Sequence, residues 1–182
     1  MARPLRIQDP GYYHVTSRGN DGADIFIDVG DRQLFISLLN RIARDSDWSL
    51  HAWCLMTNHF HLVVENRQAN LSAGMHRLNG VYARWFNERH ERTGHLFGRR
   101  FWAKPIAGEP QLYNTAEYVF DNPVRAGLCR SRPEWPWLGG LFWRHAAAAR
   151  SGARPILRRV RTCPVPGTGH VPRGYLGFGK AG

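Results

Sequence analysis

Two histidines, His59 and His61, flank Phe60 within an apolar run that extends from residue 53 to residue 64. Alternate side chains of a β-strand point to the same face, so both imidazoles would project together from a strand. Two ring nitrogens about 7 Å apart along a strand can share one divalent metal ion. Such triplets also arise by chance in strands whose histidines are packed or solvated. His59 and His61 are therefore candidate metal ligands that need support from elsewhere in the chain.

A tyrosine and an asparagine four residues apart, Tyr118 and Asn122, are the next candidates for chemistry. Residues with this spacing lie on one face of a helix and can point at one site. A phenol can attack the phosphorus of a metal-bound phosphodiester, because the metal neutralises the charge that develops. The amide oxygen of Asn122 could add a metal ligand. The ordinary alternative for Tyr118 is a half-buried side chain with a hydrogen-bonded hydroxyl.

The other tyrosines and histidines are weaker candidates for the site. Tyr113 lies on the same predicted helix, but about 500° of helical rotation before Tyr118, and so faces another direction. No comparable partner is found for the seven remaining histidines, which are His14, His51, His76, His90, His95, His145 and His170.

The elements that must position these residues can be predicted from periodicity. Strands are predicted at residues 12–17, 48–57, 59–66 and around 101–104. Helices are predicted to begin after Asp31 as the N-cap, at Asn70 or Ser72, and at residues 109–110. The last helix should end at Asn122, because a residue before proline avoids the α region.

This order, β-α-β-β-α-β-α, is typical of an α+β fold of the ferredoxin-like split βαβ type. We expect a sandwich in which an antiparallel sheet carries two helices on one face. An extra C-terminal helix carries Tyr118. The predicted domain comprises residues 1–133, and residues 134–182 form a basic, Trp/Gly/Pro-rich extension that is partly flexible. Its tryptophans are expected to cover an edge of the core.

The charge of the chain predicts a polyanionic partner. Among 182 residues, 25 are Lys or Arg and 14 are Asp or Glu, which gives a net charge of +11. All but Lys104 and Lys180 of the basic residues are arginine, whose planar guanidinium suits phosphate. Residues 130–182 carry 10 basic residues and 1 acidic residue, so this segment could lie along a nucleic-acid backbone or remain a solvated tail.

Cysteine content and hydropathy indicate the compartment. The three cysteines lack CxxC spacing, so neither a disulfide framework nor a zinc-thiolate site is predicted. No stretch is long and apolar enough to cross a membrane, and no apolar leader follows the N-terminus. The expectation is a cytoplasmic, nucleoid-associated bacterial protein without a membrane partner or a small-molecule substrate.

Four segments together carry a resemblance to a known family. They span about residues 12–128 in the expected order, and together they are far more specific than any one alone. The chain resembles the single-tyrosine transposases of the HUH superfamily, most closely the REP-associated tyrosine transposases, at residues 13–20, 55–63, 98–101 and 118–128.

The resemblance implies a metal-dependent DNA endonuclease and strand transferase. In such enzymes the residues that match His59 and His61 hold a divalent cation, Mg or Mn, and the residue that matches Asn122 commonly completes the metal shell. The residue that matches Tyr118 attacks phosphorus and forms a 5′-phosphotyrosine. The implied substrate is single-stranded DNA with a hairpin, in this branch a repetitive extragenic palindrome (REP).

Four arginines beside the matching segments, Arg18, Arg99, Arg100 and Arg125, are the best candidates for contacts with the DNA backbone. Some relatives exchange the tyrosine helix between two subunits, so a homodimer is compatible with the resemblance. Two other classes compete with this interpretation. One is a non-cleaving nucleic-acid-binding protein, such as a domesticated transposase or a sheet-based RNA binder. The other is a replication initiator or plasmid relaxase, which the short chain disfavours.

Overall fold

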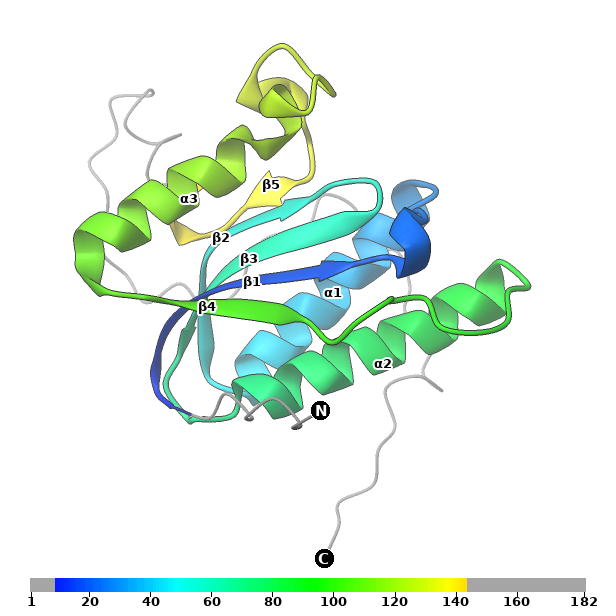
Figure 1. Ribbon diagram of the computed structural model, residues 1–182, viewed down its shortest axis with the longest axis horizontal. Helices are drawn as coiled ribbons and strands as arrows, with labels where there is room; N and C mark the ends of the chain where they lie inside the picture. Colours follow the sequence, from blue (N-terminus) through cyan, green and yellow to red (C-terminus); the bar gives the residue numbers. More distant parts are fainter. Residues whose placement is uncertain (1–8, 144–182) are drawn as a thin grey trace, which may run out of the picture.

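The computed structural model describes residues 9–143 of the chain. Strands and helices alternate along most of this range (Figure 1). The elements are β1 (Gly11–Arg18), η1 (Asn20–Gly22), α1 (Val29–Asp45), β2 (Trp48–Leu55), β3 (His59–Asn66), α2 (Leu71–Arg89), β4 (Trp102–Ile106), α3 (Gly108–Arg125), η2 (Arg132–Glu134) and β5 (Leu138–Gly139).

The five strands form one antiparallel sheet in the order β4-β1-β3-β2-β5. β2 and β3 form an antiparallel hairpin, and β1 pairs with β3 over the whole length of both strands. The register places Thr16 opposite His61 and Arg18 opposite His59. Because directly opposed residues point to the same face of a sheet, β1 and β3 present these four side chains together.

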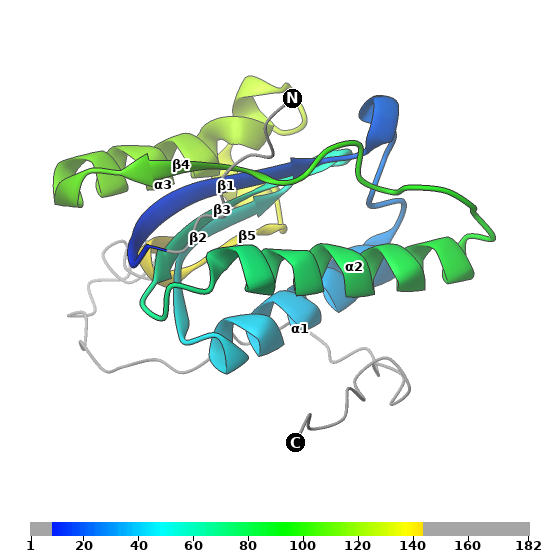
Figure 2. The same cartoon turned by 60° about the horizontal axis from the view of Figure 1, so that its bottom comes forward.

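Helices cover both faces of this sheet. α1 and α2 lie side by side on one face, and α3 lies on the other (Figure 2). Phe60, Leu62 and Val64 of β3 pack in the core shared with α1 and α2, whereas Val63 packs in a second core with residues of α3 such as Val119. The α+β sandwich is therefore confirmed, with α3 as the extra helix on the face that carries His59 and His61.

The start of α1 differs from the sequence prediction. Asp28, not Asp31, is the N-cap. Its carboxylate accepts a hydrogen bond from the backbone N–H of Asp31 (3.0 Å), and the Asp31 carboxylate accepts one from the backbone N–H of Asp28 (3.2 Å). This reciprocal pair is a capping box, in which the residue three positions after the N-cap also carries an acceptor. The prediction of Asp31 as N-cap was wrong because Asp28 and Asp31 are both acidic and the spacing alone does not rank them.

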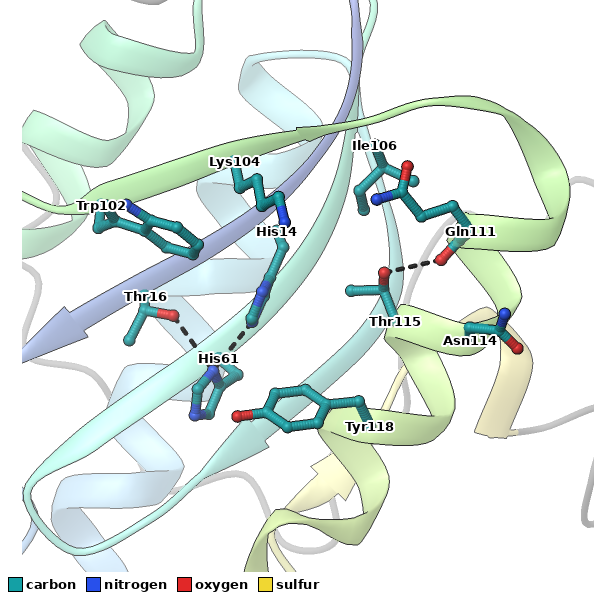
Figure 3. Close-up of a pocket in the computed structure, with 10 residues that line it drawn as sticks. All are labelled: His14, Thr16, His61, Trp102, Lys104, Ile106, Gln111, Asn114, Thr115 and Tyr118. Atoms are coloured by element: carbon teal, nitrogen blue, oxygen red, sulfur yellow. Dashed lines mark hydrogen bonds between the residues drawn. The ribbon is translucent and has the colours of Figure 1, made fainter.

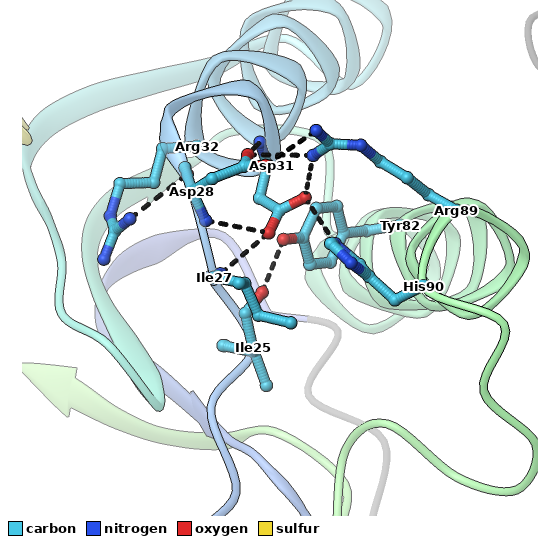
Figure 4. Close-up of polar contacts among 8 residues, drawn as sticks. All are labelled: Ile25, Ile27, Asp28, Asp31, Arg32, Tyr82, Arg89 and His90. Atoms are coloured by element: carbon cyan, nitrogen blue, oxygen red, sulfur yellow. Dashed lines mark hydrogen bonds and ion pairs between the residues drawn. The ribbon is translucent and has the colours of Figure 1, made fainter.

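The buried carboxylate of Asp31 also ties α1 to the end of α2. Arg89 donates hydrogen bonds to both Asp28 and Asp31, and the imidazole of His90 lies 2.9 Å from the same Asp31 oxygen (Figure 4). Beneath them, the Tyr82 hydroxyl donates to the carbonyl of Ile25 at 2.5 Å. The N-terminus of α1 and the C-terminus of α2 are thus joined by charge-assisted hydrogen bonds.

Helix α3 continues past the point where proline was predicted to end it. Pro123 lies inside the helix, which extends to Arg125. Proline has no N–H for the carbonyl four residues earlier, Val119. The side-chain amide of Asn122 approaches that carbonyl at 3.5 Å and donates to the carbonyl of Tyr118 at 2.8 Å. The helix instead ends at Arg125 with Ala126 as the C-cap, and the next residue, Gly127, has a φ of 69°, as is common for a glycine directly after a C-cap.

The chain after α3 returns to the edge of the sheet. The indole N–H of Trp135 donates to the carbonyl of Leu55 at 3.0 Å, and Leu138 pairs with Cys54 as part of β5. The prediction that these tryptophans cover an edge of the core is confirmed for Trp135 and Trp137. The proposed boundary at residue 133 stays a prediction, because residues 144–182 of the extension lie outside the described residues. In the range 9–143, no helix combines the length and apolar character needed to span a membrane.

Candidate active site

Both histidines of the pair lie on β3, on the face of the sheet that α3 covers. Their ring centroids are 5.0 Å apart and the rings are nearly perpendicular, at 82°. His61 is buried and His59 is half-buried. The two-residue period of a strand thus delivers both imidazoles to one place, as the sequence predicted.

A hydrogen bond holds one nitrogen of each ring. His59 Nδ1 lies 2.7 Å from Oδ1 of Asn58, an acceptor that requires a proton on Nδ1. His61 Nδ1 lies 3.0 Å from Nε2 of His14 and 3.1 Å from Oγ1 of Thr16. Ligating histidines commonly have such a partner on the second nitrogen, which fixes the ring and directs the other nitrogen at the metal. Nε2 is therefore the nitrogen that each ring can offer to a cation.

Burial keeps these imidazoles neutral. It lowers the pKa of His61 to about 3, with the neighbouring His14 and His59 adding to the effect. The pKa of His59 is also lowered, chiefly by burial and secondly by the charge of Arg18. A metal ion binds the neutral ring. The pair is thus in the protonation state that a ligand needs.

Tyr118 reaches the histidines from α3. Its ring centroid lies 6.0 Å from that of His61 and 5.9 Å from that of His14, both nearly perpendicular contacts. Figure 3 shows the phenolic oxygen directed toward His61. The side chain is 41% exposed, and within residues 9–143 its hydroxyl has no hydrogen-bond partner. Since all these residues belong to one chain, the arrangement needs no second copy.

A pocket of about 430 Å³ opens beside the tyrosine (Figure 3). β1, β3 and β4 form its floor and α3 forms a wall. No carboxylate lines it among the described residues. Its lining consists of His14, Thr16, His61, Trp102, Lys104, Ile106, Gln111, Asn114, Thr115 and Tyr118.

Asn122 lies one helical turn after Tyr118, as predicted, but its side chain is turned back on its own helix. The amide donates to the carbonyl of Tyr118 at 2.8 Å. No contact joins Asn122 to either histidine in the described part of the chain. The structure therefore brings Tyr118 to the pair and leaves Asn122 supporting the helix around Pro123, so its role as a metal ligand stays a prediction.

The four predicted arginines fall into two places. Arg18 lies opposite His59 in the strand register, and the guanidinium of Arg125 lies 5.5 Å from the centre of the Tyr118 ring. Arg99 and Arg100 instead line a separate groove of about 950 Å³ that α2 forms with residues 94–101. Two of these arginines thus flank the histidines and the tyrosine, and two lie apart from them.

The sequence analysis missed His14, which was expected to have no partner. Its Nε2 lies 3.0 Å from His61 Nδ1, and burial lowers its pKa to about 4, with the charge of Lys104 as a second cause. Thr16, Trp102 and Lys104 were missed as well. Alternation along the first strand places His14 and Thr16 on one face, but nothing local shows that this strand pairs with the histidine strand.

Comparison with known proteins assigns this arrangement to a class. The family model described as "Transposase IS200 like" matches residues 8–122, which include the whole histidine and tyrosine arrangement. The chain therefore belongs to the IS200-like transposase family.

Two individual proteins match the chain and carry more specific names. A protein of Haemophilus influenzae, named as a REP-associated tyrosine transposase, is 30% identical over 97 residues. The match covers 47% of this chain and 55% of the relative, so the chain spans about half the length of the curated relative it matches. A solved structure of a REP-associated tyrosine transposase bound to a REP hairpin has a TM-score of 0.65 at 19% identity and covers 94% of this chain and 100% of its own. At this identity the second match supports the fold.

Proposed function

We propose that this protein is a metal-dependent DNA nicking and joining enzyme that acts on hairpin-containing single-stranded DNA. The observation that carries the proposal is the contact of Tyr118 with His61 and His14 beside a pocket that no carboxylate of residues 9–143 lines. Family membership and the hairpin bound to the structural relative support the choice of substrate.

The donor set at the histidine pair fits a divalent cation. Each imidazole has its Nδ1 held by a protein partner, and burial favours the neutral form that offers Nε2. No group of three or more His, Cys, Asp or Glu ligands joins them in residues 9–143, so most coordination positions would be left to phosphate oxygens and water. When bound, Mg²⁺ or Mn²⁺ would polarise the scissile phosphate and neutralise its developing charge.

The remaining steps belong to the side chains of the protein. The Tyr118 oxygen attacks phosphorus, and the bond between Oη and phosphorus forms as the bond to the 3′-oxygen breaks. The phenol gives up its proton and the departing 3′-oxygen takes one up, with water as the carrier, so that no net proton is lost. The DNA is then left as a 5′-phosphotyrosine and a free 3′-hydroxyl. Rejoining reverses these steps without ATP, because the phosphotyrosine conserves the energy of the phosphodiester. The guanidinium of Arg125 lies over the Tyr118 ring, and in this proposal it binds a nearby phosphate.

Formation of a covalent adduct tests the proposal. A labelled single-stranded hairpin oligonucleotide is incubated with Mg²⁺ or Mn²⁺, and protein–DNA adducts are separated under denaturing conditions. The wild-type protein should form an adduct that Tyr118→Phe lacks. Tyr113→Phe is the matched control, because this tyrosine lies on the same helix, is 58% exposed, and does not line the pocket. An adduct in Tyr118→Phe, or its loss in Tyr113→Phe, would contradict the role of Tyr118.

Histidine variants separate cleavage from binding. His59→Ala and His61→Ala should abolish cleavage and spare most of the DNA affinity, because affinity should come from the arginines. Equal loss of both would indicate a folding role for the histidines. Hairpin binding without cleavage by the wild-type protein would favour the non-cleaving, domesticated alternative.

A further inference from the structure

An exposed tryptophan of β4 borders the pocket beside Tyr118. Trp102 opposes Thr16 in the register of β4 against β1, and Lys104 opposes His14, so both project onto the face that carries the histidines. Trp102 is 55% exposed. Within the described residues its one ring contact is perpendicular, with His14 at 5.8 Å and 88°, so no ring is stacked parallel on the indole.

The facing wall carries an oriented hydrogen-bond donor. Oε1 of Gln111 accepts a hydrogen bond from the backbone N–H of Ala107 at 2.6 Å. That bond identifies which end of the amide is the oxygen and leaves the NH₂ group for another partner. In Figure 3 Trp102 and Lys104 lie on one side of the pocket, Gln111 lies across from them, and Tyr118 borders the space near His61.

These features together match one nucleotide. An aromatic face can stack a base of any sequence, and a Lys ammonium can pair with a phosphate. An amide donor can bond to an acceptor on the edge of a base. The pocket volume of about 430 Å³ lies in the range of small-ligand sites, and no carboxylate among the described lining residues opposes an anion.

We propose that this pocket binds the unpaired nucleotide next to the scissile phosphate, with its base stacked on Trp102 and its phosphate near Lys104. The inference rests on the proposed function, since the position of the phosphate relative to Tyr118 defines which nucleotide is held. In this proposal Trp102 positions the DNA for attack by Tyr118. The stacking contact does not depend on which base is present.

A double-mutant cycle between protein and DNA tests this contact. Binding of a hairpin oligonucleotide with unpaired flanks is measured in EDTA with Tyr118→Phe protein, so that no cleavage occurs. A series of oligonucleotides is used, each with one abasic site at a different position in the unpaired flanks. At one position next to the cleavage point, the abasic site should weaken binding by about 5- to 150-fold, the range for the loss of one stacked base. Trp102→Ala should cause a similar loss with the intact DNA, and the two losses should not add.

Two further variants guard against a folding artefact. Trp102→Phe keeps an aromatic face and should retain most of the affinity, whereas Tyr113→Ala removes an exposed aromatic outside the pocket and should change nothing. Additive losses for Trp102→Ala and every abasic site would overturn the proposal, as would a flank with no abasic-sensitive position. These outcomes are distinct from failure of the proposed function, which is judged by adduct formation with Mg²⁺ or Mn²⁺ rather than by binding in EDTA.

Discussion

At the scale of single residues, each imidazole of the pair is held by a neighbouring side chain. Asn58 is the clearest case. Its Oδ1 accepts from His59 Nδ1, and its Nδ2 donates to the carbonyl of Gly22 at 3.0 Å, so that the amide is fixed at both ends. A ring held in this way loses little freedom when it binds a cation. The orientation of His59 therefore depends on a side chain from the turn before β3.

Removal of this support should weaken metal binding. Asn58→Ala is expected to lower Mn²⁺ affinity by about 10- to 100-fold, the usual cost of losing an outer-sphere partner. Asn58→Asp keeps an acceptor for the Nδ1 proton and should bind Mn²⁺ better than Asn58→Ala does. Calorimetric titration with Mn²⁺ measures both, and Asn40→Ala in α1 on the opposite face is the control. Unchanged affinity in Asn58→Ala would show that the hydrogen bond to His59 is dispensable.

At the scale of elements, the sheet depends on two helices that are tied together by charge. The carboxylate of Asp31 is fully buried and accepts from Arg89, while Asp28 bonds to the same guanidinium at the surface. Leaving a buried carboxylate without one of its hydrogen-bond donors costs more free energy of folding than an exposed ion pair contributes. The junction between the start of α1 and the end of α2 is thus a point where one substitution should affect the whole fold.

Arg89→Ala should lower the free energy of unfolding by about 1–3 kcal/mol, because it leaves a buried carboxylate with fewer donors. Arg84→Ala, on the same helix but with no ion pair among the described residues, should change it by less than about 0.5 kcal/mol. Urea denaturation of both variants gives the comparison. Equal effects would mean that helix propensity rather than the Asp31 contact is responsible.

The same junction should make stability sensitive to acid. Hydrogen bonds from Arg89 hold the pKa of Asp28 at about 2, below its ordinary value. A carboxylate with a lowered folded-state pKa contributes stability above its unfolded pKa of about 3.9, and loses that contribution as pH falls through the folded value.

Asp28→Asn removes this charge but keeps an amide that can cap the helix. Wild-type protein should be more stable than Asp28→Asn at pH 6, and the difference should shrink as the pH falls from about 4 to about 2. Denaturation in urea at a series of pH values measures it. A difference that stays constant over this range would argue against the pairing of Asp28 with Arg89.

At the scale of the whole molecule, unpaired positive charge gathers in the groove beside α2, which no carboxylate of residues 9–143 lines. Several other arginines are paired with acidic residues, as Arg77 is with Asp45. Arg84, Arg99 and Arg100 lie along the groove beside α2, and within residues 9–143 they have no ion-pair partner. An unpaired guanidinium can neutralise phosphate without first breaking an ion pair.

Salt dependence of hairpin binding reports these contacts. Each phosphate contact adds about one unit to the slope of log affinity against log salt. Arg99→Ala and Arg100→Ala should each reduce that slope by about 1 if they touch the DNA backbone. Arg77→Ala, which removes a paired arginine, should leave it unchanged. Filter binding or fluorescence anisotropy between low and moderate salt gives the slopes, and an unaltered slope in both groove variants would remove the groove from the binding surface.

Strand and helix periodicity determined much of the local geometry of the site in advance. A repeat of two fixed His59 and His61 on one face of β3, and a spacing of four fixed Tyr118 and Asn122 on one side of α3. These relations are short-range, because they follow from the backbone repeat alone. The order of elements along the chain was also enough to predict the class of fold.

Only the tertiary structure determined which residues lie beside His59 and His61. The pairing of β1 with β3 brought His14 and Thr16 to His61, the pairing of β4 with β1 brought Trp102 and Lys104 to the same pocket, and the packing of α3 brought Tyr118. None of these contacts can be predicted from local periodicity, because strand order and register bring together segments that are far apart in the sequence. The choice of Asp28 over Asp31 as the N-cap also became clear only in the structure, where each carboxylate accepts from the other residue's backbone N–H.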